Sequence, residues 1–162
     1  MPGASITVHR PLEWIDTDAA GIWHYTTAIR YAEHAELELH RALGIMDQTF
    51  GRTPRVHIEL DLISPVRFGD WLATTLTVAD VGRSSISYDV TITSDRDAHV
   101  RGRIVTVLLD RPGGRSVEVP DDLRAALTDG SGLTGQSLRL GTEDGRHEPA
   151  DAEMQGQPTN QG

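Results

Sequence analysis

The chain of 162 residues contains neither cysteine nor lysine. The missing cysteine excludes disulfides, zinc thiolate sites, iron–sulfur clusters and a cysteine nucleophile. All 15 basic residues are arginine, so a lysine Schiff base and a Walker-type lysine are excluded as well. They are outnumbered by 24 acidic residues, and the net charge of −9 argues against a nucleic-acid-binding protein with a broad basic face.

Long apolar runs are also missing. No window approaches the roughly 18 consecutive apolar residues of a transmembrane helix, and the N-terminal residues lack the apolar region of a signal peptide. We therefore expect no contact with a membrane and a soluble, cytoplasmic protein.

The composition changes near residue 129. Residues 130–162 are rich in glycine, glutamine and acidic side chains and contain no aromatic residue. Such a segment buries too little apolar surface to offset the entropy that ordering would cost. The length of the rest suits a single domain. We predict a folded domain over 1–129 and a disordered tail over 130–162.

The folded part has a simple order of expected elements. Apolar residues alternate with polar ones in five predicted strands, and they recur every three or four positions in a predicted helix about 30 Å long. The strands are predicted within 5–15, 56–62, 72–78, 86–92 and 99–109, the long helix over 24–43, and a short helix near 121–127. An antiparallel five-stranded sheet wrapped around one long central helix buries both apolar faces, which is an α+β architecture.

Three short segments connect these elements. They read DTDAAG at 16–21, PVRFGD at 65–70 and VGRSS at 81–85. In this order and spacing they resemble the 4-hydroxybenzoyl-CoA thioesterase family of hotdog-fold proteins, over about residues 5–127. The resemblance implies hydrolysis of an acyl thioester of coenzyme A or of an acyl carrier protein. It also implies no cofactor, and a homodimer or homotetramer.

The resemblance assigns roles to particular residues. Asp18 matches the catalytic carboxylate of the family, and the backbone N–H of Tyr25 matches the group that polarises the thioester carbonyl. One large subgroup carries a histidine at the position of Tyr25, whereas this chain has His24 one place earlier, so His24 is a further catalytic candidate. An arginine that contacts coenzyme A in the family matches Arg83.

The residues themselves support this chemistry. A carboxylate can act as base or nucleophile, and free N–H groups at the start of a helix attract a developing anion. Asp16 lies closer to the first strand than Asp18 does and is better placed to fix the loop through hydrogen bonds. Trp23 at the helix start and Arg67 in a turn are candidates for substrate binding.

Two other functions use the same residues. His24 with Asp18 could serve a hydratase or dehydratase of the same fold, and a non-catalytic acyl-binding protein could share the fold. Glu36 and His40 lie four residues apart, but they match no metal-ligand motif and are typical of a solvated helix face. We therefore expect no metal site.

Overall fold

The computed structural model describes residues 3–95, 97–129 and 136–140. Its strands and helices follow the predicted order. They are β1 (Ser5–Pro11), a short 3₁₀-helix (Trp14–Asp16), α1 (Tyr25–Ala42), α2 (Met46–Thr49), β2 (Arg55–Leu62), β3 (Trp71–Val81), β4 (Ser85–Thr93), β5 (Ala98–Val107), α3 (Asp121–Thr128) and β6 (Gln136–Arg139).

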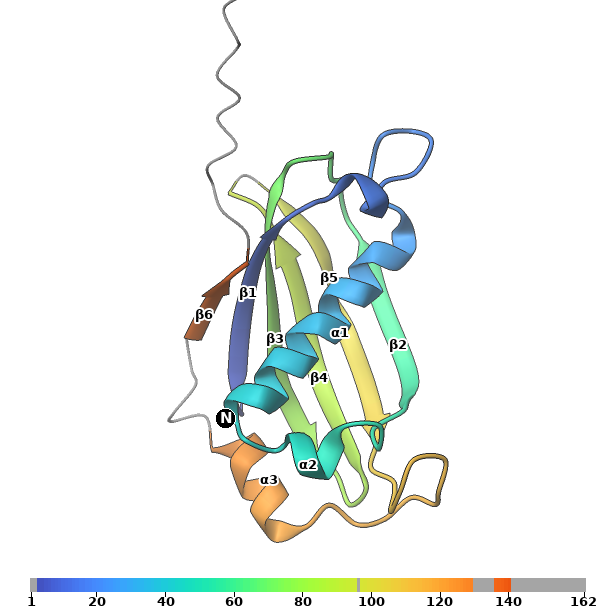
Figure 1. Ribbon diagram of the computed structural model, residues 1–162, viewed down its shortest axis with the longest axis vertical. Helices are drawn as coiled ribbons and strands as arrows, with labels where there is room; N and C mark the ends of the chain where they lie inside the picture. The colour runs from blue at the N-terminus through green and yellow to red at the C-terminus, as the bar shows by residue number, and fades with distance from the viewer. Residues whose placement is uncertain (1–2, 96, 130–135, 141–162) are drawn as a thin grey trace, which may run out of the picture.

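All six strands form one sheet in the order β2-β5-β4-β3-β1-β6. The pairs from β2 to β1 are antiparallel, whereas β6 runs parallel to β1. The sheet curves around α1, which crosses its concave face (Figure 1). The α+β arrangement and the short helix predicted near 121–127, which is α3, are confirmed, with two differences in detail: the sheet has a sixth strand, and the short helix α2 follows the long one.

The sixth strand corrects the prediction of a disordered tail. Residues 136–139 pair with Ile6–His9 of β1, and the backbone N–H of Leu140 donates to the carbonyl of His9 at 2.7 Å. Leu138 and Leu140 pack against the core. The remaining residues of the predicted tail, 130–135 and 141–162, lie outside the described residues.

Small side chains let α1 approach the sheet closely. The residues predicted to form the apolar stripe of this helix are Ala28, Ala32, Ala35, Leu39 and Ala42. The first four are buried, whereas Ala42 at the end of the helix is exposed. The helix packs mainly on β1 and β3. The other edge of the concave face therefore receives less cover from α1.

That edge is β2, whose apolar side chains remain accessible. Ile58 and Leu62 alternate with polar residues and so share a face with Leu60, which packs against the core, while Val56 lies in the irregularity between Arg55 and His57. The exposed fractions of Val56, Ile58 and Leu62 are 61%, 40% and 51%. β2 thus carries an open strand edge and an apolar stripe, which is an arrangement that a second chain could cover.

Candidate active site

The loop between β1 and α1 is held in place by Asp16. Its buried carboxylate accepts hydrogen bonds from Arg30 Nη2 at 2.8 Å and from the Tyr31 hydroxyl at 2.9 Å. It also accepts one from the backbone N–H of Glu13 at 3.2 Å. Burial raises the pKa of Tyr31 well above its ordinary value, so this hydroxyl stays protonated and donates. The predicted positioning role of Asp16 is confirmed.

Asp18 lies two residues further on and points its carboxylate at solvent. The backbone N–H of Ala20 donates to Asp18 Oδ1 at 2.8 Å, and a tight turn follows in which Gly21 adopts a positive φ of 73°. Among the described residues, Oδ2 of Asp18 has no hydrogen-bond partner. The loop therefore fixes this carboxylate through one oxygen and leaves the other for a ligand or a water molecule.

The chain returns from this turn to the start of α1. The backbone N–H of His24 donates to the carbonyl of Asp16 at 2.8 Å, which ties the helix start to the loop. His24 is the N-cap of α1, because its Nδ1 accepts from the backbone N–H of Thr26 at 3.3 Å. The Tyr25 N–H is the first in the helix and has no acceptor among the described residues. The start of this 18-residue helix therefore offers a free N–H donor at the positive end of the helix dipole.

Trp23 and Arg67 lie where this loop meets the 65–70 turn. The Trp23 N–H donates to the carbonyl of Val66 at 2.9 Å, and Ile22 forms an isolated bridge with Arg67. The Trp23 ring is only 5% exposed and stands edge-on to His99. Its position is that of a packing residue, whereas Arg67 is exposed beside the loop.

Arg83 lies at the opposite end of the sheet from Asp18. It occupies the turn after β3, where its carbonyl accepts from the Val119 N–H at 2.8 Å. The 11 residues of β3 separate this turn from the end of the strand near the 65–70 turn, a distance of about 35 Å. A single chain therefore does not bring Arg83 and Asp18 together.

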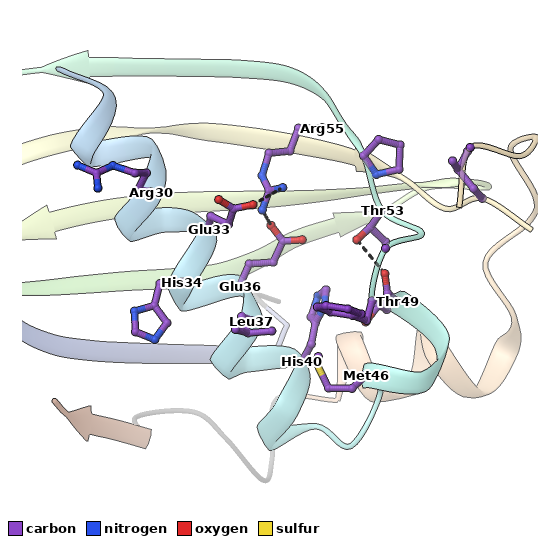
Figure 2. Close-up of a pocket in the computed structure, with 15 residues that line it drawn as sticks. Arg30, Glu33, His34, Glu36, Leu37, His40, Met46, Thr49, Thr53 and Arg55 are labelled. Atoms are coloured by element: carbon purple, nitrogen blue, oxygen red, sulfur yellow. Dashed lines mark hydrogen bonds and ion pairs between the residues drawn. The ribbon is translucent and has the colours of Figure 1, made fainter. Parts of the chain in front are cut away.

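A second group of polar side chains surrounds a cavity of about 760 Å³ beside α1 (Figure 2). Arg55, at the start of β2, donates to Glu36 Oε2 at 2.6 Å and contacts Glu33 Oε1 at 3.2 Å. Next to them, His40 Nε2 and the Tyr88 hydroxyl are 2.9 Å apart. Apolar side chains from α1, α2 and the adjoining loops complete the lining.

This burial contradicts the expectation of a solvated helix face. The exposed fractions of Glu36 and His40 are 5% and 4%. Burial raises the pKa of Glu36 to about 7, although the Arg55 guanidinium opposes the change. Burial, assisted by Arg55, lowers the pKa of His40 to about 4. At neutral pH His40 is therefore uncharged and Glu36 is close to its midpoint.

No group of three or more histidine and carboxylate side chains within residues 3–95, 97–129 and 136–140 is arranged to hold a metal ion. Over the same ranges, none of the helices combines the length and apolar character of a membrane span.

Comparisons with known proteins identify the family of this chain. The thioesterase-like superfamily matches residues 12–127. A 1,4-dihydroxy-2-naphthoyl-CoA hydrolase from Nostoc punctiforme is 28% identical over 126 residues, which are 74% of this chain and 84% of that protein.

Solved structures share the fold. A 1,4-dihydroxy-2-naphthoyl-CoA thioesterase from Synechocystis superposes with a TM-score of 0.68 at 20% identity, over 76% of this chain and 96% of its own. A thioesterase from Thermus thermophilus, complexed with coenzyme A and Zn, gives 0.69 at 22% identity, over 75% and 90%. The family match confirms the resemblance carried by the three connecting segments: the chain belongs to the thioesterase-like superfamily and has its hotdog fold.

Proposed function

We propose that this protein hydrolyses acyl-CoA thioesters, with Asp18 as the catalytic carboxylate and the Tyr25 N–H as the donor to the carbonyl oxygen. The observation that supports the proposal is that the loop leading into α1 carries an exposed carboxylate and that the helix it leads into begins with an N–H that has no acceptor among the described residues. The names of the curated relatives support coenzyme A as the carrier.

The reaction places different demands on these two groups. As negative charge develops on the carbonyl oxygen, the Tyr25 N–H and the helix dipole stabilise it. Asp18 either attacks the carbonyl carbon or removes a proton from the attacking water. In both routes the carbon–sulfur bond breaks and the thiolate leaves, later taking a proton from solvent. Attack by Asp18 would form an anhydride, which water then hydrolyses to regenerate the carboxylate.

The two aspartates of the loop have separate tasks in this scheme. Asp16 is buried and bonded to Arg30 and Tyr31, so it has no free oxygen to offer a substrate. Its carbonyl holds the His24 N–H and thereby orients the helix start beside Asp18. His24 serves as the cap of that helix, and this use of Nδ1 gives no support to a hydratase role.

The proposal includes a homodimer in which two β2 strands pair. The outer edge of β2 supports it because pairing covers that edge, and the exposed side chains of Val56, Ile58 and Leu62 support it because they would lie beside the second subunit. A twofold axis perpendicular to the sheet would bring the opposite ends of the two subunits together. Arg83 then approaches an Asp18 site only as a residue of another subunit, where it can meet a phosphate group of coenzyme A.

A thiol-release assay tests the proposed activity. Purified protein is incubated with acyl-CoA and acyl-carrier-protein thioesters, and free thiol is measured. We expect hydrolysis by the wild-type protein and a kcat lower by about 10² to 10⁴ in Asp18→Asn, whose side chain has the same shape but is a poor base. Asp80→Asn, at an exposed aspartate of β3, should keep wild-type kcat. Near-normal turnover by folded Asp18→Asn would remove the catalytic assignment and favour an acyl-binding protein.

A further inference from the structure

The turn between β3 and β4, which carries Arg83, is fixed by contacts from outside its own hairpin. Four successive carbonyl groups, those of residues 81–84, accept hydrogen bonds from residues that lie between β5 and the end of α3. The Leu108 N–H donates to the Ser84 carbonyl and the Val119 N–H donates to the Arg83 carbonyl, both at 2.8 Å. The backbone of the turn is therefore held in place, while the Arg83 side chain is exposed.

Arg124 of α3 makes two of these four contacts with one side chain. Its Nη1 donates to the Val81 carbonyl at 2.6 Å, and its Nη2 donates to the Gly82 carbonyl at 3.0 Å. α3 contacts β3 and lies at the end of the sheet where β3 turns into β4 (Figure 1). A planar guanidinium group holds two neighbouring acceptors in one fixed geometry, whereas the ammonium group of a lysine is a point charge.

The charges near this turn make the direction of Arg83 important. Exposed carboxylates lie close in sequence to the turn and to its contacts, in Asp80, Glu118 and Asp121. Among the described residues, however, Arg83 forms no ion pair. Since the surroundings do not have a net positive charge, a phosphate group would depend on guanidinium N–H groups that already point at it.

We propose that Arg124 is a positioning residue for coenzyme A. By holding the Val81 and Gly82 carbonyls, it keeps the Arg83 guanidinium directed at a phosphate group of coenzyme A. This inference rests on the proposed thioesterase function and on the contact proposed for Arg83. It adds a residue of another helix that acts through Arg83 and sets the affinity for the carrier part of the thioester.

Two substrates with the same acyl group test this role. One is the acyl-CoA that the wild-type protein hydrolyses fastest, and the other is the S-acyl pantetheine, which has the same thioester but no phosphate. In Arg83→Gln and Arg124→Gln, we expect the KM for the acyl-CoA to rise about 10-fold or more, as for the loss of a hydrogen bond to a charged group. The kcat for the acyl-CoA, and kcat/KM for the acyl pantetheine, should keep their wild-type values. Calorimetric titration with free coenzyme A measures the same loss of affinity without turnover.

The double variant shows whether Arg124 acts through Arg83. Once Arg83 is replaced, the turn has no guanidinium left to direct, so loss of Arg124 should have no further effect. The affinity of Arg83→Gln/Arg124→Gln for coenzyme A should therefore equal that of Arg83→Gln alone. If the two effects multiply in the double variant, Arg124 contributes independently of Arg83, and the positioning role is wrong.

A conservative variant separates geometry from charge. Arg124→Lys keeps the positive charge but loses the planar pair of donors, so its affinity for coenzyme A should fall as in Arg124→Gln. This variant also keeps the test usable if Arg124→Gln does not fold. Wild-type affinity in Arg124→Lys together with reduced affinity in Arg124→Gln would show that charge alone suffices, which overturns the inference. As a control, Arg101→Gln removes the same charge from an exposed position of β5 and should bind coenzyme A like the wild type.

The outcomes distinguish the inference from the function on which it rests. Wild-type affinity for coenzyme A in Arg83→Gln or in Arg124→Gln would overturn the inference and leave the thioesterase intact. Equal losses for the acyl-CoA and the acyl pantetheine would also overturn it, because they indicate a general disturbance of the fold. Failure of the wild-type protein to hydrolyse any thioester would overturn the proposed function itself.

Discussion

The buried residues Glu36 and His40 should each make the free energy of unfolding depend strongly on pH, and their two effects should nearly cancel in the wild-type protein. Burial raises the pKa of Glu36 from its ordinary 4.5 to about 7 and lowers that of His40 from 6.5 to about 4. Between about pH 4.5 and 6.5 the folded protein therefore holds a protonated Glu36 and a neutral His40. The unfolded chain holds a carboxylate and an imidazolium instead. Both states bind the same number of protons, so the contribution of the pair to the free energy of unfolding is nearly constant.

Substituting one of these two residues reveals the contribution of the other to the pH dependence of stability. In His40→Gln only the raised pKa of Glu36 remains, and its stabilisation is complete below pH 4.5 and lost as the pH rises through 7. At about 1.36 kcal/mol per pH unit, the change from 4.5 to about 7 corresponds to about 3 kcal/mol. In Glu36→Gln only the lowered pKa of His40 remains. Its stabilisation is complete above pH 6.5 and falls by about 3 kcal/mol as the pH drops to 4.

Urea unfolding from pH 4 to 7.5 at one protein concentration measures these slopes. Each variant is compared with the wild type at every pH, so that the titration of all other groups cancels. His34→Gln, at a less buried histidine of α1, serves as the control and should follow the wild type. A difference between His40→Gln and the wild type that stays constant from pH 4.5 to 7 would refute the reasoning. The reasoning would also be refuted if the free energies of unfolding of His40→Gln and Glu36→Gln changed in the same direction with pH, relative to the wild type.

Three further predictions use the same protein. Asp16→Asn should lower the free energy of unfolding by about 3 kcal/mol, because Arg30 loses a charged acceptor, and chemical denaturation measures this loss. Ile58→Lys should shift the dimer toward monomer at micromolar concentration, as seen by light scattering, because it places a charge on the exposed apolar stripe of β2. A chain ending at Asp129 should melt several degrees below one ending at Leu140, since only the longer chain retains β6, and calorimetry compares the two. Equal melting temperatures would contradict the contribution of β6.

The sequence predicted those features that depend on local pattern. The spacing of Ala28, Ala32, Ala35 and Leu39 located α1 and its buried face, and alternation located the five antiparallel strands. The role of Asp16 as a residue that fixes the loop also followed from its place in the turn. These inferences succeed because residues three or four apart in a helix, and two apart in a strand, lie on the same face.

The errors concern contacts between residues far apart in the chain. Glu36 and His40 were assigned to a solvated face because their spacing says nothing of Arg55 and Tyr88, which reach them from β2 and β4. β6 was missed because its alternating apolar pattern is very short. The pattern consists of Leu138 within the four-residue strand and Leu140 just after it, in a segment rich in glycine and acidic residues. The charge of Arg55, at the start of β2, is a signal that could have suggested a partner for Glu36.

The pairing of β6 with β1 has a consequence for how many copies can join. An antiparallel sheet with two accessible edges can add chains at both ends without limit, which is the route to fibrous aggregates. Here β6 covers the edge of β1 and is the outer strand at that end of the sheet, while β2 is the outer strand at the other end, in the part of the chain that the structure describes. β2 spans eight residues and β6 only four, so β6 offers a further chain fewer backbone groups to pair with, and very short edge strands are one way in which proteins limit such pairing. The last strand thus disfavours growth at its own end of the sheet and favours a pair of chains joined through β2.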